Sequence, residues 1–273
     1  MAGKLYVVGT PIGNLSDISE RGKKTLESVD FIAAEDTRVT AKLLNHFDIK
    51  KPLISYYEHN KREKGTVITD RILAGETCAI VTDAGMPCIS DPGEDLIRDC
   101  HEIGIEVESV PGPTAFATAL AISGMETGRF TFEGFLSVNK QSRKVHLDEL
   151  KGEKRTMIFY EAPHKLRNTL KDLYSFFGDR EIAIVKELTK IHETVMRTTL
   201  KAANEYFETE NPKGEYVLII AGDKETKKQP LTFEEAVLSA KELADKGMSV
   251  NEAAKTVAAE TGFKKSDIYK SLL

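Results

Sequence analysis

The sequence predicts two α/β domains followed by a small helical module. Three observations predict this fold: short apolar runs alternate with amphipathic stretches up to residue 110, the rhythm changes after Pro111-Gly-Pro113, and the residues beyond 231 have only helical spacing. The 273 residues are too many for one small core and suit two or three compact units. We therefore expect domains at residues 1–112, 113–223 and 231–273.

The first domain is expected to contain a mainly parallel sheet, because strand–helix alternation implies right-handed crossovers. Its helical spacing is clearest where Leu96, Cys100 and Ile103 fall on one face. The expected strands are 5–8, 31–34, 79–81 and 105–110, and the expected helices are roughly 19–29, 37–47, 60–75 and 91–103.

The second domain is expected to contain an antiparallel or mixed sheet, because polarity alternates over residues 130–135 and indicates a strand with one wetter face. The expected strands are 130–135, 156–160, 181–185 and 216–220, and the expected helices are 114–123, 139–150 and 163–177.

A charged polar stretch at residues 222–230 reads as a linker to the helical module. Helices are expected from Thr232 to Gly247, from a capping box of Ser249 and Glu252 to Gly262, and over 267–272. Two helices joined by a short Gly-containing turn form the helix-turn-helix pattern, which serves either nucleic-acid binding or packing and dimerisation.

The composition is typical of a globular protein, with 41% hydrophobic residues, 30% charged residues and a net charge of −5. That charge counts against tight, nonspecific binding to bare nucleic acid. The longest apolar runs are strand-sized, well short of the ~20 residues of a membrane helix. No secretory signal is visible, so we expect a cytoplasmic protein. An odd number of cysteines without a C-x-x-C pair, and histidines without H-x-x-x-H spacing, predict no metal site.

Three rigid loops, each at the end of a predicted parallel strand, predict a single ligand pocket. Ligands of open parallel sheets bind outside the carboxyl ends of the strands, and the helix after Pro113 offers free N–H groups to a polar ligand. Neither a G-x-G-x-x-G nor a G-K-[ST] motif occurs, which excludes the common dinucleotide and phosphate loops. The loops are Gly9-Thr-Pro-Ile-Gly-Asn-Leu15, Thr82-Asp-Ala-Gly-Met-Pro-Cys-Ile-Ser-Asp-Pro-Gly93 and Val110-Pro-Gly-Pro-Thr-Ala115.

Acidic side chains near these loops have two interpretations. Asp83, at a strand end, is placed to bind ligand hydroxyls or an amino group, whereas Asp91 is expected to cap the following helix. Glu35-Asp-Thr-Arg38 offers paired carboxylates for acid–base work, or equally an ion pair or a helix cap. Tyr57-Glu-His-Asn60 forms either a substrate contact or a surface loop.

These motifs, in this order, resemble the tetrapyrrole-methylase superfamily over about residues 4–222. Within it the sequence is similar to the bacterial small-subunit ribosomal RNA ribose methyltransferases, which the helical tail also matches. The motifs are Gly9–Leu15, Glu35–Arg38, Asp83–Pro87 with Ser90–Gly93, Pro111–Pro113 and Tyr160–Pro163.

The resemblance implies S-adenosyl-L-methionine in a cleft between the two α/β domains. The reaction would methylate the 2'-hydroxyl of a cytidine in the decoding region of 16S ribosomal RNA, within the small ribosomal subunit, and the superfamily habit is a homodimer. The alternatives are a methyltransferase acting on a tetrapyrrole precursor and a ligand-sensing, nucleic-acid-binding regulator.

The resemblance also assigns roles by position. The subfamily usually has threonine where this chain has Met86, so a side-chain contact there would differ. Cofactor-binding positions are Pro11, Asp83, Met86, Gly112, Thr114, Ala115 and Glu161; candidates for the catalytic base are Glu35, Asp36, Lys186 and Glu187; candidates for contact with RNA are Arg38, His59, Asn60, Lys264 and Lys265.

Overall fold

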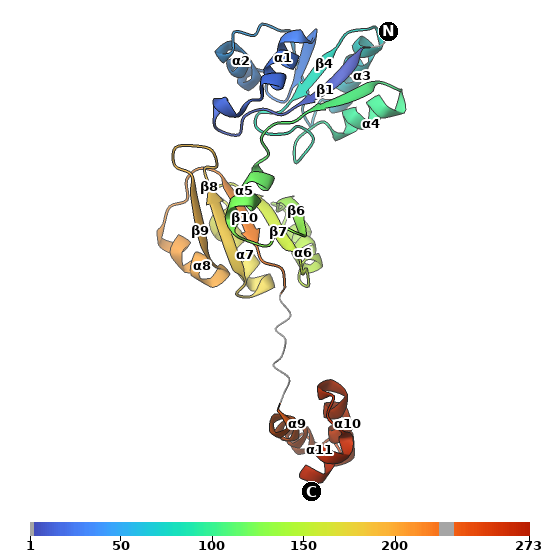
Figure 1. Ribbon diagram of the computed structural model, residues 1–273, viewed down its shortest axis with the longest axis vertical. Coiled ribbons are helices and arrows are strands. Elements are labelled where there is room, and N and C mark those ends of the chain that lie inside the picture. Colours follow the sequence, from blue (N-terminus) through green and yellow to red (C-terminus); the bar gives the residue numbers. More distant parts are fainter. Residues whose placement is uncertain (1–2, 224–231) are drawn as a thin grey trace. The chain divides into compact units, whose positions relative to one another are not determined.

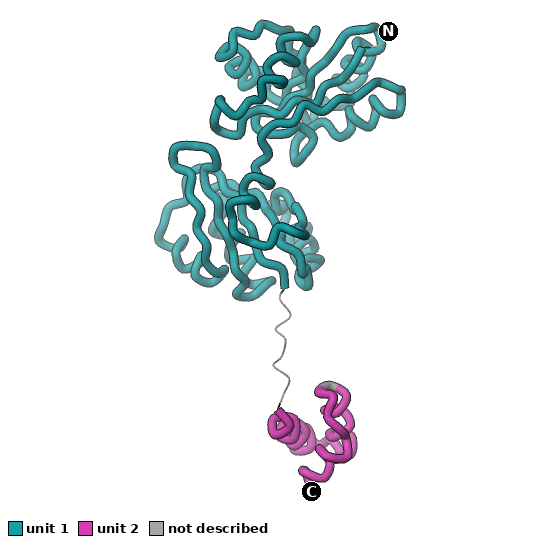
Figure 2. The backbone as a smooth tube through the Cα atoms, viewed as in Figure 1, with its two compact units in different colours: residues 1–223 teal, residues 224–273 magenta. Residues whose placement is uncertain are grey.

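The computed structural model describes residues 3–223 and 232–273. The chain divides into two compact units, residues 1–223 and 224–273 (Figure 2). Most of the expected linker, and residue 231 at the expected start of the third domain, lie outside the described residues. Across the described ranges, no helix is both long and apolar enough to cross a membrane.

The first half of unit 1 is a five-stranded sheet in the order β3-β2-β4-β1-β5 (Figure 1), and all its strand pairs are parallel, as the sequence predicts. Buried side chains cover both faces: Phe31 and Ala33 belong to one core cluster, Ile32 to the other. The elements are β1 (Lys4–Val8), η1 (Leu15–Asp17), α1 (Glu20–Ser28), β2 (Phe31–Ala34), α2 (Thr37–His46), β3 (Leu53–Ser55), α3 (Lys61–Leu73), β4 (Cys78–Val81), α4 (Glu94–Glu102) and β5 (Glu106–Val110).

The second half of unit 1 has a mixed sheet in the order β6-β7-β10-β8-β9, in which β6 and β7 are parallel and the other pairs antiparallel. One core cluster joins this sheet to α6, α7 and α8. Another holds α5 and, from the first loop, Ile12. The elements are α5 (Ala115–Ser123), β6 (Phe130–Phe135), α6 (Lys140–Glu149), β7 (Thr156–Glu161), α7 (Leu166–Phe177), β8 (Glu181–Lys186), β9 (Thr194–Thr199), α8 (Leu200–Thr209) and β10 (Tyr216–Ile220).

Unit 2 consists of α9 (Phe233–Asp245), α10 (Val250–Thr261) and α11 (Lys265–Ser271). Small side chains such as Ala236, Ala240 and Ala254 allow the helices to pack closely around Ile268. The first two expected helix starts are present, whereas α11 begins at Lys265, two residues before the expected Asp267. Thr232 and Glu235 form a complete capping box, and the Ser249 hydroxyl accepts a hydrogen bond from the Glu252 N–H.

The three loops that follow β1, β4 and β5 interlock through their backbones. Thr10 and Gly85 exchange N–H···O bonds of 2.9 and 3.2 Å, and the Gly9 N–H donates to the Val110 carbonyl at 3.1 Å. Gly9 and Gly112 touch: a Cβ atom on Gly9 would lie 2.6 Å from the Gly112 Cα, which is closer than any side chain permits. Glycine is therefore required at both positions, and the loops hold one another in place.

Replacing Gly9 by alanine tests this contact. The added methyl group overpacks the crossing, so we expect Gly9→Ala to lower the free energy of unfolding by about 1–3 kcal/mol, equivalent to a Tm lower by about 2–4 °C per kcal/mol. Gly128→Ala is the control, because a Cβ atom there meets nothing within 4 Å. Calorimetric scans that give the same Tm for both variants would contradict the close contact.

Candidate active site

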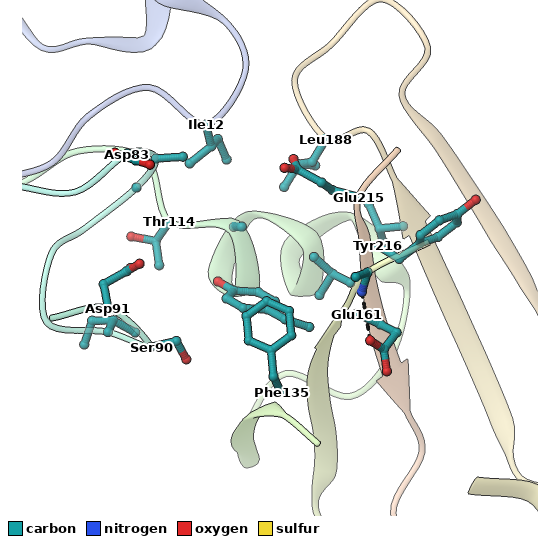
Figure 3. A pocket seen from close by; sticks show the side chains of 18 of the residues that line it. Ile12, Asp83, Ser90, Asp91, Thr114, Phe135, Glu161, Leu188, Glu215 and Tyr216 are labelled. Carbon is teal, nitrogen blue, oxygen red and sulfur yellow. Dashed lines mark hydrogen bonds between the residues drawn. The ribbon is translucent and has the colours of Figure 1, made fainter. Parts of the chain in front are cut away.

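A cavity of about 540 Å³ lies between the two halves of unit 1 (Figure 3). Its size falls within the usual ~300–1,000 Å³ of small-molecule sites. In Figure 3, Ile12, Asp83 and Asp91 face Leu188, Glu215 and Tyr216 across the opening. Residues of the first half that line it are Ile12, Glu35, Ala84–Met86 with Asp83, and Ile89–Asp91; those of the joint and the second half are Thr114, Ala115, Phe135, Tyr160–His164, Val185, Leu188 and Glu215–Val217.

Glu35 and Asp83 follow the neighbouring strands β2 and β4, and hydrogen bonds hold them side by side. The Thr82 hydroxyl donates to Glu35 Oε2 at 2.6 Å. The Asp83 N–H donates to the same oxygen at 3.4 Å, and the Asp36 N–H donates to Asp83 Oδ1 at 3.2 Å. Both carboxylates are thus fixed in orientation before any ligand binds.

Glu35, Asp83 and Asp91 form one side of the cavity, which we call the acidic wall. Burial and the nearby Glu35 raise the pKa of Asp83 above its usual range. Burial, together with the charges of Glu35 and Asp83, raises the pKa of Asp91 to about 6. The wall therefore concentrates negative charge at neutral pH.

The expected role of Asp91 as a helix cap is wrong. Helix α4 begins at Glu94, its N-cap is Gly93 and no side chain caps it. Cys88 and Ser90 have positive φ angles of 69° and 62°, so the chain turns sharply before the helix. Asp91 consequently lines the cavity instead of reaching the helix end.

The opposite side of the cavity contains the aromatic side chains of Phe135 and Tyr160, and hydrogen bonds within the protein hold several of its side chains in place. The Tyr160 hydroxyl accepts the Phe116 N–H at 3.0 Å, which ties β7 to the first turn of α5. Burial raises the pKa of Tyr160 to about 12. Glu161 is 3% exposed; its carboxylate accepts the Ala162 N–H at 2.8 Å and the Thr169 hydroxyl. The Glu161 carboxylate is therefore held in a fixed position on this side of the cavity, opposite the acidic wall.

Five of the seven positions expected to bind the cofactor line the cavity: Asp83, Met86, Thr114, Ala115 and Glu161. Thr114 is the N-cap of α5, but its side chain makes no capping hydrogen bond. Pro11 lines a neighbouring, smaller hollow. Gly112 contacts Gly9 where the first and third loops meet and is not among the residues that line the cavity.

Of the four candidates for the catalytic base, Glu35 alone is among the residues that line the cavity. Asp36 caps α2 through the Arg38 N–H at 2.8 Å, and its ion pair with Arg38 lowers its pKa to about 2. Glu187 pairs with Lys190 at 2.9 Å, which lowers the pKa of Glu187. Lys186 ends β8 and is half-buried.

The residues expected to contact RNA lie apart from the cavity. Asn60 Oδ1 accepts the Tyr57 N–H at 2.8 Å, and its amide donates to the Ser55 carbonyl at 3.1 Å, as in a structural turn. His59 is exposed beside the Tyr57 ring. Arg38 is exposed on α2, and the exposed Lys264 and Lys265 belong to unit 2.

Sequence reasoning missed several residues of the second half that line the cavity, among them Phe135 and Tyr216. In a mixed sheet either end of a strand can face the ligand, so the strand-end rule that identifies the first three loops gives no signal here. The strands β3 and β9 were also missed, because β3 is only three residues long and β9 is mostly polar. Helix α8 was missed although Leu200, Ala203 and Phe207 form a buried apolar face. In residues 3–223 and 232–273, no group of three or more His, Cys, Asp or Glu side chains is arranged to hold a metal ion.

Two curated relatives share most of the chain. A Synechocystis protein named ribosomal RNA small subunit methyltransferase I is 45% identical over 269 residues, covering 98% of this chain and 96% of that protein. A Thermotoga maritima protein of the same name is 47% identical over 220 residues, covering 81% of this chain and 99% of that protein. The Thermotoga protein is therefore shorter than this chain by about the length of unit 2.

Solved structures share the fold at lower sequence identity. A cobalt precorrin-4 methyltransferase superposes with a TM-score of 0.60 at 20% identity, covering 80% of this chain and 94% of that chain. A diphthine synthase superposes with a TM-score of 0.62 at 12% identity, covering 81% and 90%. The family model of Tetrapyrrole (Corrin/Porphyrin) Methylases matches residues 4–204. The chain therefore belongs to the tetrapyrrole methylase family.

Proposed function

We propose that the chain transfers a methyl group from S-adenosyl-L-methionine to the 2'-hydroxyl of a cytidine in 16S ribosomal RNA. The observation that carries the proposal is the acidic wall facing an aromatic wall across one cavity, in a chain whose full-length relatives are named as ribosomal RNA small subunit methyltransferases.

The cavity suits this cofactor chemically. A sulfonium and an ammonium group are both cationic, and the acidic wall of Glu35, Asp83 and Asp91 favours them. Phe135 and Tyr160 offer ring surfaces to the adenine. Thr114 and the N-terminus of α5 suit the carboxylate of the methionine part. When bound, the cofactor supplies an activated methyl group.

The protein's own contribution is to position the reactants and to accept a proton. Alignment of reactants can supply up to ~7–11 kcal/mol of the barrier, and the interlocked loops keep the cavity rigid for this purpose. A ribose hydroxyl is a weak acid, so a carboxylate that accepts its proton would add ~10²–10⁴-fold. Glu35, the sequence candidate that lies at the cavity, and its neighbour Asp83 are the carboxylates available for this role.

The acceptor distinguishes this proposal from its alternatives. The cobalt precorrin-4 methyltransferase shares only the fold, so a tetrapyrrole precursor has no support from close relatives. A regulator that only senses a ligand would need no turnover. We also propose that the domain boundary lies between residues 112 and 113 and that the chain forms a cytoplasmic homodimer. Its substrate particle in this proposal is the small ribosomal subunit.

A methyl-transfer assay tests the function directly. Labelled cofactor is offered with small ribosomal subunits that lack the modification, naked 16S RNA and a precorrin-type tetrapyrrole. We expect label in the ribosomal RNA of the subunits, at the ribose of a cytidine after nuclease digestion. Label in the tetrapyrrole alone, or no label in any acceptor, would contradict the proposal.

Removing unit 2 tests how the RNA is bound. The Thermotoga relative is shorter by about this length, so we place unit 2 outside the catalytic machinery. Its helix-turn-helix pattern and the exposed Lys264 and Lys265 favour a role in RNA docking. Deleting residues 225–273 should raise the KM for subunits roughly tenfold, about 1.4 kcal/mol of lost binding, while calorimetry shows an unchanged Kd for the cofactor. An unchanged KM would show that unit 2 does not dock RNA.

The Asp91→Asn variant tests the acidic wall, because the fold favours the protonated, neutral form of the Asp91 side chain. The pKa of Asp91 in the fold is about 6, so its contribution to stability is present below the ordinary value near 3.8 and is lost as pH rises through 6. The variant should therefore raise the Tm of the ligand-free protein by about 2–4 °C at pH 7.5 and hardly at all at pH 4, while weakening cofactor binding at pH 7.5. Equal effects on Tm at both pH values would contradict the cause given for the shift.

A further inference from the structure

A smaller hollow of about 260 Å³ adjoins the acidic wall. Asp83 lines both this hollow and the large cavity. The first loop separates them: Ile12 lines the large cavity, whereas Pro11 and Gly13 line the small hollow. The two other hollows described, near Arg129 and near Ile97, share no lining residue with the large cavity.

A methyl acceptor must lie directly against the cofactor, because the reacting atoms have to come within ~3–3.5 Å in line. A hollow that shares a wall with the cofactor cavity satisfies this condition. We propose that the small hollow binds the acceptor nucleoside, with its pyrimidine base against the apolar side chains and its 2'-hydroxyl on Asp83. This inference rests on the proposed function and assigns the substrate site for it.

The walls of the hollow suit a base taken out of an RNA strand. Leu15, Val39 and Leu43 provide aliphatic surface from two elements, η1 and α2. Leu15 and Val39 are 42% and 38% exposed. A bound base would cover both. Sequence-specific RNA recognition uses splayed single-stranded bases of this kind.

The rim of the hollow suits the phosphates beside that base. Lys42 lines the hollow, and Arg38 lies four residues earlier on α2, so both cations project from the same face of the helix. The Arg38 side chain is 87% exposed, and its ion pair with Asp36 holds it at the start of α2. Such contacts position an RNA strand without reading its sequence.

Asp83 is placed to receive the hydroxyl proton. The ribose oxygen forms the new O–CH₃ bond, the S–CH₃ bond breaks with its electron pair remaining on sulfur, and the hydroxyl proton passes to the Asp83 carboxylate. The product is a neutral thioether beside a protonated Asp83, which then releases its proton to water. Glu35, Asp36, Arg38 and Asp91 are the charged groups that act on Asp83, and its raised pKa makes it a better proton acceptor than an ordinary aspartate.

Filling the hollow tests the inference. Val39→Trp places a large ring where the base would bind, so the KM for small ribosomal subunits should rise at least tenfold while the calorimetric Kd of the cofactor changes less than twofold. Val67→Trp is the matched control, because Val67 is 41% exposed on α3 and lines none of the described hollows. Leu15→Trp fills the hollow from the other side and replaces Val39→Trp if that variant fails to fold.

Asp83→Asn separates proton transfer from binding. At saturating cofactor and subunits its kcat should fall at least 100-fold, and the acid limb of the wild-type kcat profile, in which activity is lost as pH falls through the pKa of Asp83, should disappear. Retention of that limb would overturn the role of Asp83. If wild-type protein labels no RNA, the proposed function fails; if it does label RNA and Val39→Trp matches Val67→Trp in KM, the acceptor site alone is wrong.

Discussion

The backbone contact between Gly9 and Gly112 is the constraint on which the rest of the site depends. A side chain at either position would force the first and third loops apart. With the loops in contact, Thr10 can pair with Gly85 and fix the second loop as well. Three strand ends thus become one rigid surface, and Ile12 reaches from it into the core of the second half. The loops that line the cavity also join the two halves of unit 1.

A group of three carboxylates, Glu35, Asp83 and Asp91, is the second feature of the site. Burial, and to a lesser extent mutual repulsion, disfavours the charged forms of Asp83 and Asp91 and raises the pKa values of both. Carboxylates with raised pKa values are typical of functional sites, where a cationic ligand can stabilise their charged forms. By contrast, Asp36 and Glu187 have lowered pKa values because nearby cations neutralise them. The directions of these pKa shifts distinguish the two aspartates that line the cavity from carboxylates in ordinary surface ion pairs.

Much of unit 1 could be predicted from sequence because its signals are local. The buried strands β2 and β4 are continuous apolar runs, and the glycine and proline loops that follow parallel strands indicate a pocket. Asp83 and Thr114 were found in this way. Asp91 was not, because an aspartate just before a helix can serve either as a helix cap or as a ligand contact. The positive φ angles of Cys88 and Ser90 turn the chain so that Asp91 lines the cavity instead. Tyr216 depends on the order of strands in a mixed sheet, which no local pattern encodes.

The central claim is that the acidic wall selects a cationic sulfonium ligand. Isothermal titration calorimetry with S-adenosyl-L-methionine and with its neutral thioether product tests it, since both ligands carry the same amino and carboxylate groups. Protonation of Asp91 near pH 6 should weaken the wall. The affinity ratio of sulfonium to thioether should therefore fall severalfold between pH 7.5 and pH 5. A ratio that stays constant over this range would contradict the claim.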